Sequence, residues 1–308
     1  MVRLGTGDDA AVLGPRRGHD WVISTDWFLQ GVHFLGDRHP PRSVGYKALA
    51  RATSDLAAMG AAPLYFLLTL ALPSARTGPW LDEFSRGMAQ AAREFGMRLL
   101  GGDLSRQKTV AISLTVMGEV PSGEAVTRAG AQPGDSIYVS GKLGAAQLGL
   151  ETFLRGGRSR PPWTRAALRA HLHPQPRLAL GRWLARRHMA TAMIDLSDGL
   201  SSDLARLCRA SQTGAEIAEC SLPIALLPST GPAGKPAALK RALHGGEDYE
   251  LLFTVPARLT RSIPARFDGI TLTRIGKITA RRKILLVDAN GHARPLLPGG
   301  WDPFARSR

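Results

Sequence analysis

The pattern of apolar and polar positions predicts a chain in which strands and helices alternate. Short apolar runs rich in β-branched residues predict strands at 21–25, 64–72, 110–116, 136–140, 192–196, 250–255 and 284–287. Apolar residues at helical spacing predict helices at 41–59, 80–95, 144–154, 174–187 and 201–210. This alternation favours an α/β (α+β) fold.

A polar stretch rich in glycine and proline at residues 121–134 divides this pattern into two parts. We therefore expect one domain at residues 1–130 and a second at 131–308. Residues 222–238, also proline-rich, are expected to be irregular.

Composition indicates a globular protein, with 44% hydrophobic and 21% charged residues. The longest apolar run, at 63–73, is too short to span a bilayer, and the first ten residues lack the apolar core of a secretory signal. We therefore expect a cytoplasmic protein that does not bind membranes. Cys208 and Cys220 do not have the spacing of a metal site.

The formal net charge of +15 raises the possibility of a nucleic-acid partner. The basic residues are scattered, however, and no basic stripe interleaved with aromatic residues is present. We expect a solvated basic surface and no nucleic acid. A basic nucleic-acid-binding module without catalysis stays open as the alternative from a different class.

Acidic residues recur where strand-like runs meet small residues, although the chain has only 25 of them. We interpret these places as tight turns; they contain Asp8, Asp9, Asp26, Asp103, Asp195, Asp198, Glu247 and Asp248, while Asp55 lies on a predicted helix. Carboxylates suit Mg²⁺, and glycine lets backbone amides approach phosphate oxygens. A single aspartate in such a turn is more often a cap or turn residue. The repetition favours magnesium–phosphate chemistry, and neither a P-loop nor the protein-kinase motifs are present.

The chain resembles the thiamine-monophosphate kinase family, within the superfamily of aminoimidazole ribonucleotide synthetase. The matching segments are GDDAAVL at 7–13, STDWFLQGVHF at 24–34, YKALARATSDLAAMGAAP at 46–63, GGDLSR at 101–106, TRAGAQPGDSIYVSGKLGAA at 127–146, AMIDLSDGLSSDL at 192–204, LHGGEDYELLFTVP at 243–256 and GWDPF at 300–304. Their order and spacing match the family over nearly the whole chain.

The resemblance implies two α/β domains, of which the N-terminal one binds ATP and Mg²⁺ and forms a homodimer with a shared β-barrel. The C-terminal domain would complete the site. The implied reaction is the ATP-dependent phosphorylation of thiamine monophosphate to thiamine diphosphate by direct in-line transfer, with several Mg²⁺ ions.

The resemblance also implies roles for individual residues. The implied metal ligands are Asp9, Ser24, Thr25, Asp26, Asp55, Asp103, Asp195 and Asp198, with Asp26, Asp103 and Asp198 in catalytic roles. The implied ATP contacts are Gly102, Asp103, Arg128 and Ser197. The implied contacts to the thiamine substrate are His33, Glu247 and Trp301.

Another ATP-using synthetase of the same superfamily is the nearest alternative. The pairing of STD at 24–26 with GVHF at 31–34 favours the thiamine branch.

Overall fold

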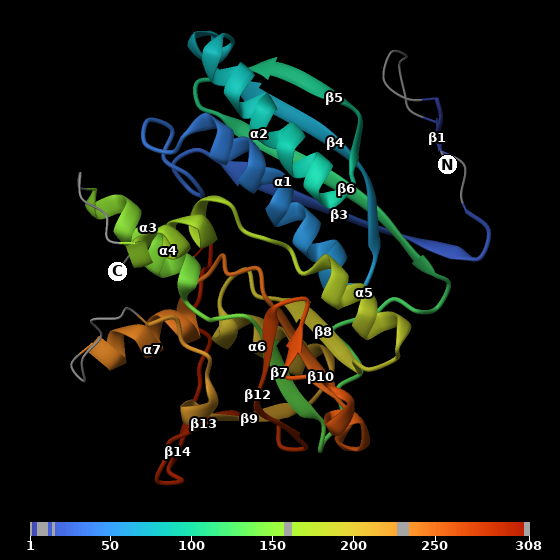
Figure 1. The fold of residues 1–308 in the computed structure, drawn as a ribbon, viewed down its shortest axis with the longest axis vertical. Coiled ribbons are helices and arrows are strands. Elements are labelled where there is room, and N and C mark those ends of the chain that lie inside the picture. Colours follow the sequence, from blue (N-terminus) through green and yellow to red (C-terminus); the bar gives the residue numbers. More distant parts are fainter. Residues whose placement is uncertain (1, 5–11, 14–15, 157–161, 227–233, 305–308) are drawn as a thin grey trace.

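Two β-sheets lie one above the other along the long axis of the molecule (Figure 1). The computed structural model describes residues 2–4, 12–13, 16–156, 162–226 and 234–304. A four-stranded sheet occupies the N-terminal half and an eight-stranded sheet the C-terminal half. A small antiparallel pair is formed by β1 (Val2–Leu4) and β2 (Val12–Leu13). The expected mixed α/β class is confirmed.

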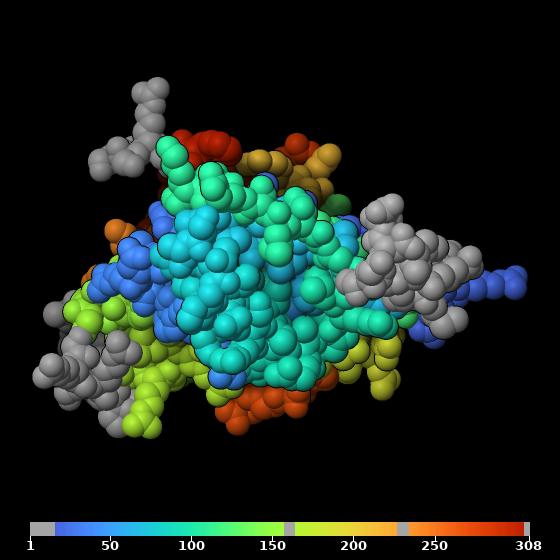
Figure 2. All heavy atoms as spheres, turned by 90° about the horizontal axis from the view of Figure 1, so that it is seen from above, coloured from blue at the N-terminus to red at the C-terminus, as the bar shows by residue number. Residues whose placement is uncertain are grey.

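The N-terminal sheet has the strand order β3-β6-β4-β5, and only β4 and β5 run parallel. Its strands are β3 (His19–Leu29), β4 (Ala62–Leu72), β5 (Arg98–Arg106) and β6 (Ala111–Pro121). Helices α1 (Pro41–Ala58) and α2 (Pro79–Phe95) cover one face of this sheet, with η1 (Ser74–Arg76) before α2. Figure 2 shows the end of the molecule that this half forms, coloured blue to green.

Side chains alternate across β3, so the two faces of the sheet differ. Phe28 is 2% exposed beneath α1, whereas Ile23 and Trp27 are 61% and 55% exposed on the other face. Ser24 and Asp26 lie on the same face of β3 as Phe28. The sheet of a single chain is open on the Ile23–Trp27 face, so the barrel implied by the resemblance is not formed within one chain.

The C-terminal sheet has the strand order β14-β13-β9-β12-β7-β10-β8, with β11 paired to β12. Its strands are β7 (Ser136–Ser140), β8 (Ala192–Asp195), β9 (Gly214–Ala218), β10 (Leu251–Val255), β11 (Arg266–Phe267), β12 (Ile270–Thr279), β13 (Ile284–Val287) and β14 (Ala293–Pro295). The helices of this half are α3 (Ala145–Arg155), α4 (Pro162–Leu172), α5 (Leu178–Arg186), α6 (Leu200–Ala210), α7 (Lys235–His244), η2 (Glu219–Ser221) and η4 (Ala257–Ser262).

An apolar cluster joins the two halves where α1 meets α5. Ala57 of α1 is fully buried together with Leu184 of α5 and Phe253 of β10. Residues 122–135, all of which are described, carry no helix or strand. None of the helices in the described ranges is both long and apolar enough to cross a membrane.

The local predictions were correct for most elements, and the differences have physical causes. The helix expected at 174–187 begins only at Leu178, because Pro174 and Pro176 remove backbone donors. The turns expected at Asp26 and Asp103 are wrong, since both residues lie inside paired strands, β3 and β5. Strands β9 and β12 and helix α4 were missed. In the stretch expected to be irregular, α7 begins at Lys235, and residues 227–233 lie outside the described part.

Candidate functional site

The candidate site lies where α1 and β3 face two loops of the C-terminal half. The first loop, residues 245–250, is fixed at both ends. The Asp248 carboxylate accepts the backbone N–H groups of Gly144 (2.6 Å) and Ala146 (2.9 Å) at the start of α3. Glu250 accepts from both edge nitrogens of Arg177, with 2.6 Å to Nε.

Glu247 lies at the centre of this loop in a strained backbone conformation, with φ 68°. Its backbone N–H donates to the carbonyl of Ser197 (2.8 Å). Its carboxylate accepts from Lys47 Nζ of α1 at 2.7 Å, although Lys47 is only 2% exposed. Burial opposes ionisation of Glu247, but Lys47, His171 and Arg51 together hold its pKa below the usual range.

Two buried histidines extend this ion pair away from the cleft. His39 Nδ1 accepts the Leu35 N–H (3.1 Å), so the proton of the neutral ring lies on Nε2, 3.0 Å from His171 Nε2. His171 Nδ1 lies 3.3 Å from Lys47 Nζ and 3.4 Å from Glu247 Oε2. Burial lowers the pKa of His171, and burial and the neighbouring His171 lower that of His39 to about 4. Both rings are therefore neutral, and His171 contacts both Lys47 and Glu247.

The second loop, Ser197–Gly199, precedes α6 and is held by a buried carboxylate. Asp203 accepts the N–H groups of Asp198 and Gly199, both at 3.0 Å. Arg206 bridges Asp203 Oδ1 and Asp198 Oδ2, each at 2.5 Å. Asp198 is thereby held at the N-terminus of α6.

Carboxylates from three elements approach each other beside this loop. Ser24 of β3 donates to the Asp55 carboxylate of α1. Burial, with Asp55 as the next cause, raises the pKa of the Asp195 carboxyl well above its usual range. Burial also raises the pKa of Asp26, which Arg51 opposes and Asp55 reinforces. Such mutual repulsion is relieved by a bound cation, so the donor set suits Mg²⁺.

The residues expected on the thiamine side adjoin the Ser197–Gly199 loop. The backbone N–H of Trp301 donates to the Asp198 carbonyl at 3.0 Å, and the centre of the Trp301 ring lies 6.5 Å from that of the His33 ring. His33 Nδ1 accepts the Leu29 N–H (2.9 Å), so Nε2 carries the proton. Burial and then Arg51 lower the pKa of His33 to about 4, which keeps the ring neutral. Trp301 itself remains 47% exposed.

Two expected metal or nucleotide contacts lie elsewhere in the same chain. Asp103 of β5 is three strands away from Asp26 of β3, about 14 Å at the usual strand spacing. Asp103 pairs with Thr69 of β4, Thr69 pairs with Ser113 of β6, and Ser113 pairs with Trp27 of β3. The side chain of Asp103 therefore lies on the open face together with that of Trp27. Thr25 also lies on that face, where its hydroxyl contacts Thr115 (3.2 Å). Neither side chain reaches Asp26 within one chain, because β-strand alternation separates them.

The remaining expected residues have mixed placements. Gly102 of β5 packs so closely that a Cβ would lie 1.8 Å from the Leu68 carbonyl oxygen. Arg128 is exposed and acts electrostatically on Asp195. Asp9 lies outside the described residues. Within the described ranges, no group of three or more His, Cys, Asp or Glu side chains is assembled to hold a metal ion.

Sequence reasoning missed the cations on α1. Lys47 and Arg51 are four residues apart, as are Arg51 and Asp55, so all three lie on one stripe of the helix. Because this stripe faces the two loops, its charged residues belong to the site. The four-residue spacing of Lys47, Arg51 and Asp55 within the segment 46–63 could have indicated from the sequence that these two cations belong to the site.

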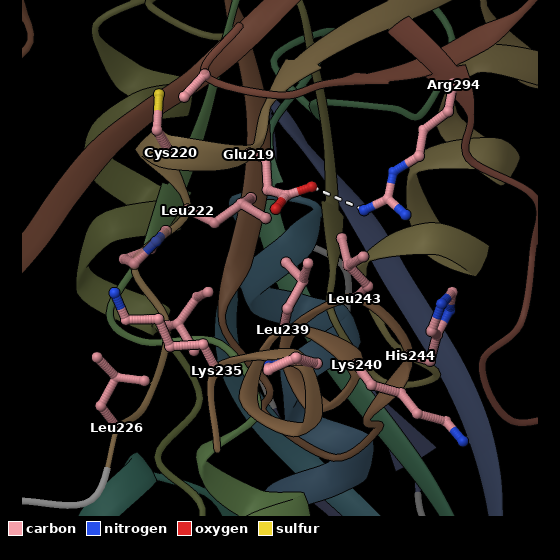
Figure 3. A pocket seen from close by; sticks show the side chains of 14 residues that line it. Glu219, Cys220, Leu222, Leu226, Lys235, Leu239, Lys240, Leu243, His244 and Arg294 are labelled. Carbon is pink, nitrogen blue, oxygen red and sulfur yellow. Dashed lines mark hydrogen bonds and ion pairs between the residues drawn. The ribbon is translucent and has the colours of Figure 1, made fainter. Parts of the chain in front are cut away.

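A separate hollow of about 940 Å³ lies beside α7 (Figure 3). Leu222, Leu239 and Leu243 line it, and an ion pair of 2.7 Å joins Glu219 to Arg294 at its side. None of the expected site residues lines it, so the candidate site is not this hollow.

Comparisons with known proteins match nearly the whole chain. Residues 7–120 match the N-terminal domain of AIR synthase related protein, and residues 132–288 match its C-terminal domain. The thiamine-monophosphate kinase of Escherichia coli K12 is 40% identical over 99% of this chain and 93% of its own length. That of Synechococcus elongatus is 40% identical over 91% of this chain and 85% of its own.

Solved structures agree. A crystal structure of thiamine-monophosphate kinase from Stenotrophomonas maltophilia K279a is 36% identical, with a TM-score of 0.84 over 95% of this chain and 92% of that one. A structure described as AaThiL complexed with AMPPCP and TMP is 30% identical, with a TM-score of 0.81 over 96% and 91%. With its fold, its motifs and these relatives in agreement, the chain belongs to the thiamine-monophosphate kinase family of AIR synthase related proteins.

Proposed function

We propose that this protein transfers the γ-phosphoryl group of ATP to thiamine monophosphate, giving thiamine diphosphate and ADP. The likeness to thiamine-monophosphate kinases over nearly the whole chain supports this activity. So does the related structure that contains AMPPCP and TMP. We further propose that the enzyme acts in the cytoplasm.

The observation that carries the assignment to this cleft is the direct contact between two sets of residues. Trp301 and Glu247, expected on the thiamine side, donate backbone hydrogen bonds to Asp198 and Ser197, expected on the phosphate side. A zwitterionic acceptor with a thiazolium ring and a phosphate group fits such a site. The Glu247 carboxylate and the Trp301 ring suit its cationic end.

Mg²⁺ is proposed as the cofactor, with Asp26, Asp55, Asp195, Asp198 and Ser24 as its holders from this part of the chain. When bound, Mg²⁺ would supply positive charge that stabilises the charge developing during transfer. The support for this proposal is the raised pKa of Asp195, to which burial and then Asp55 contribute, and the hydrogen bond from Ser24 to Asp55.

The transfer itself requires alignment rather than a strong base. A phosphate oxygen of thiamine monophosphate forms a bond to the γ-phosphorus, and the bond to the β–γ bridging oxygen breaks, so that ADP leaves with the electron pair. The acceptor oxygen is already ionised at neutral pH. The chain therefore acts by holding both phosphate groups in line and stabilising their charge.

A homodimer is proposed on the open face of the N-terminal sheet. Ile23 and Trp27 expose large apolar surfaces there, which a second copy of the sheet would cover. Asp103 and Thr25 lie on the same face, so we propose that they serve the site of the partner. The proposed domains are 1–130 and 131–308, on either side of the segment that separates the two sheets.

Release of ADP by the purified protein with Mg²⁺, ATP and a panel of acceptors tests the activity. Thiamine monophosphate is expected to give rapid turnover. Asp26→Asn, which keeps the side-chain volume, is expected to lose most turnover while remaining folded. If another acceptor of the superfamily supports turnover and thiamine monophosphate does not, the assignment to the thiamine branch is wrong.

A further inference from the structure

Arg51 of α1 is a buried cation whose hydrogen bonds are incomplete. Its side chain is 11% exposed, and Nη2 donates to Asp26 Oδ1 at 3.4 Å while lying 3.1 Å from Asp26 Oδ2. The guanidinium carbon lies 5.0 Å from the centre of the Phe28 ring. Nε and Nη1 are buried, and neither has a hydrogen-bond partner among the described residues.

Such an arrangement is unfavourable unless an acceptor binds. A buried donor without a partner costs about 1–3 kcal/mol, and more when the group is charged. Arg177 in the same chain shows the usual arrangement, since its Nε and Nη2 both donate to Glu250. Arg51 differs because only one of its three nitrogens is paired.

The position of Arg51 indicates which acceptor is missing. Its charge lowers the pKa of His33, after burial, and contributes to lowering that of Glu247, both on the thiamine side. Asp26 and Asp198, on the phosphate side, in turn favour its charged form. Arg51 pairs with Asp26 and lies one turn of α1 from Lys47, the partner of Glu247. It therefore lies between the residues expected on the phosphate side and those expected on the thiamine side, where the phosphate of an acceptor bound by its ring would lie.

We propose that Arg51 binds the phosphate group of thiamine monophosphate and makes the site select the phosphorylated acceptor over free thiamine. The end edge of the guanidinium holds Nη1 and Nη2, and the side edge holds Nε and Nη2. Each edge thus combines the nitrogen next to Asp26 with one that has no partner, so either can hold two phosphate oxygens. This inference rests on the proposed function.

The competing role for Arg51 is purely structural, as a support for the Asp26 carboxylate. That role predicts a changed dependence on Mg²⁺ without any change in the preference for the phosphorylated ligand. The two roles therefore differ in a binding ratio that can be measured without turnover.

The test compares the binding of thiamine monophosphate and thiamine by calorimetry, without nucleotide, in the wild type, Arg51→Met and Arg51→Lys. Methionine keeps the apolar contact with Phe28 but donates no hydrogen bond. We expect Arg51→Met to weaken binding of thiamine monophosphate about 10- to 100-fold, as loss of charge-assisted hydrogen bonds does, and to leave thiamine binding within about twofold. Arg51→Lys keeps the charge but loses the paired donors of the guanidinium. Its affinity for thiamine monophosphate should fall between those of the wild type and Arg51→Met.

Arg76→Met is the matched control. Arg76 also lies over an aromatic ring, 5.3 Å from the centre of Trp80, and pairs with Asp37 at 2.8 Å, outside the site. The Arg76→Met variant should leave the affinities for thiamine monophosphate and for thiamine unchanged. An unchanged ratio of the two affinities in folded Arg51→Met and Arg51→Lys would overturn the inference. A wild type that binds thiamine monophosphate no better than thiamine also overturns it, whereas lack of turnover in the wild type refutes the proposed function.

Discussion

Removing Lys47 is expected to destabilise the protein strongly, because this lysine neutralises Glu247 across the two halves of the chain. The Lys47 Nζ atom lies 2.7 Å from Glu247 Oε2, and the two side chains are 2% and 24% exposed. Breaking a buried ion pair from one side costs about 3–5 kcal/mol, since the other charge stays buried without its partner. Glu247 keeps some exposure and a weak contact to His171, so we expect Lys47→Met to lose about 3 kcal/mol.

Equilibrium unfolding in urea, followed by circular dichroism, gives the free energy of unfolding for each variant. Lys277→Met is the matched control, because Lys277 pairs with Glu216 at 2.9 Å while both side chains are well exposed, 56% and 38%. It should change the free energy by less than about 1 kcal/mol. The double variant Lys47→Met/Glu247→Gln should recover part of the lost free energy of unfolding, since it also removes the unpaired negative charge of Glu247.

Two results would refute this reasoning. A loss below about 1 kcal/mol in Lys47→Met would mean that Glu247 does not need the lysine. A double variant no more stable than Lys47→Met would mean that lost packing of the lysine side chain, rather than an unpaired carboxylate, causes the effect.

Two further predictions concern acid pH and assembly. His39 has a pKa of about 4 in the folded chain against 6.5 for an ordinary histidine, so the unfolded state takes up more protons and stability falls as the pH drops from 6.5 towards 4. His39→Gln should therefore reduce the stability lost between about pH 7.5 and about pH 5.5 by roughly 1 kcal/mol, and an equal loss in variant and wild type would contradict this. Trp27→Asp, on the open sheet face, should convert the proposed dimer to a monomer in sedimentation analysis, whereas Leu154→Asp, 40% exposed on α3, should not. A wild type that sediments as a monomer would exclude the proposed interface.

Most of the local structure could be predicted from the sequence because it depends on neighbouring residues. The helix expected at 80–95 is α2, which ends at Phe95 because Gly96 adopts the left-handed conformation with φ 70°. The strand expected at 284–287 is β13. Strand β12 was missed because its solvent-exposed and buried residues do not alternate with a period of two.

The sequence by itself determined the family and the acidic motifs, from which magnesium–phosphate chemistry was expected. It did not determine which of these motifs meet. Glu247 and Lys47 are 200 residues apart, and their ion pair exists only because α1 packs against the C-terminal loops. Asp26 and Asp103 come from similar motifs but lie on opposite edges and opposite faces of one sheet. Strand order and face depend on pairing between distant segments, and that pairing is decided only when the whole chain packs.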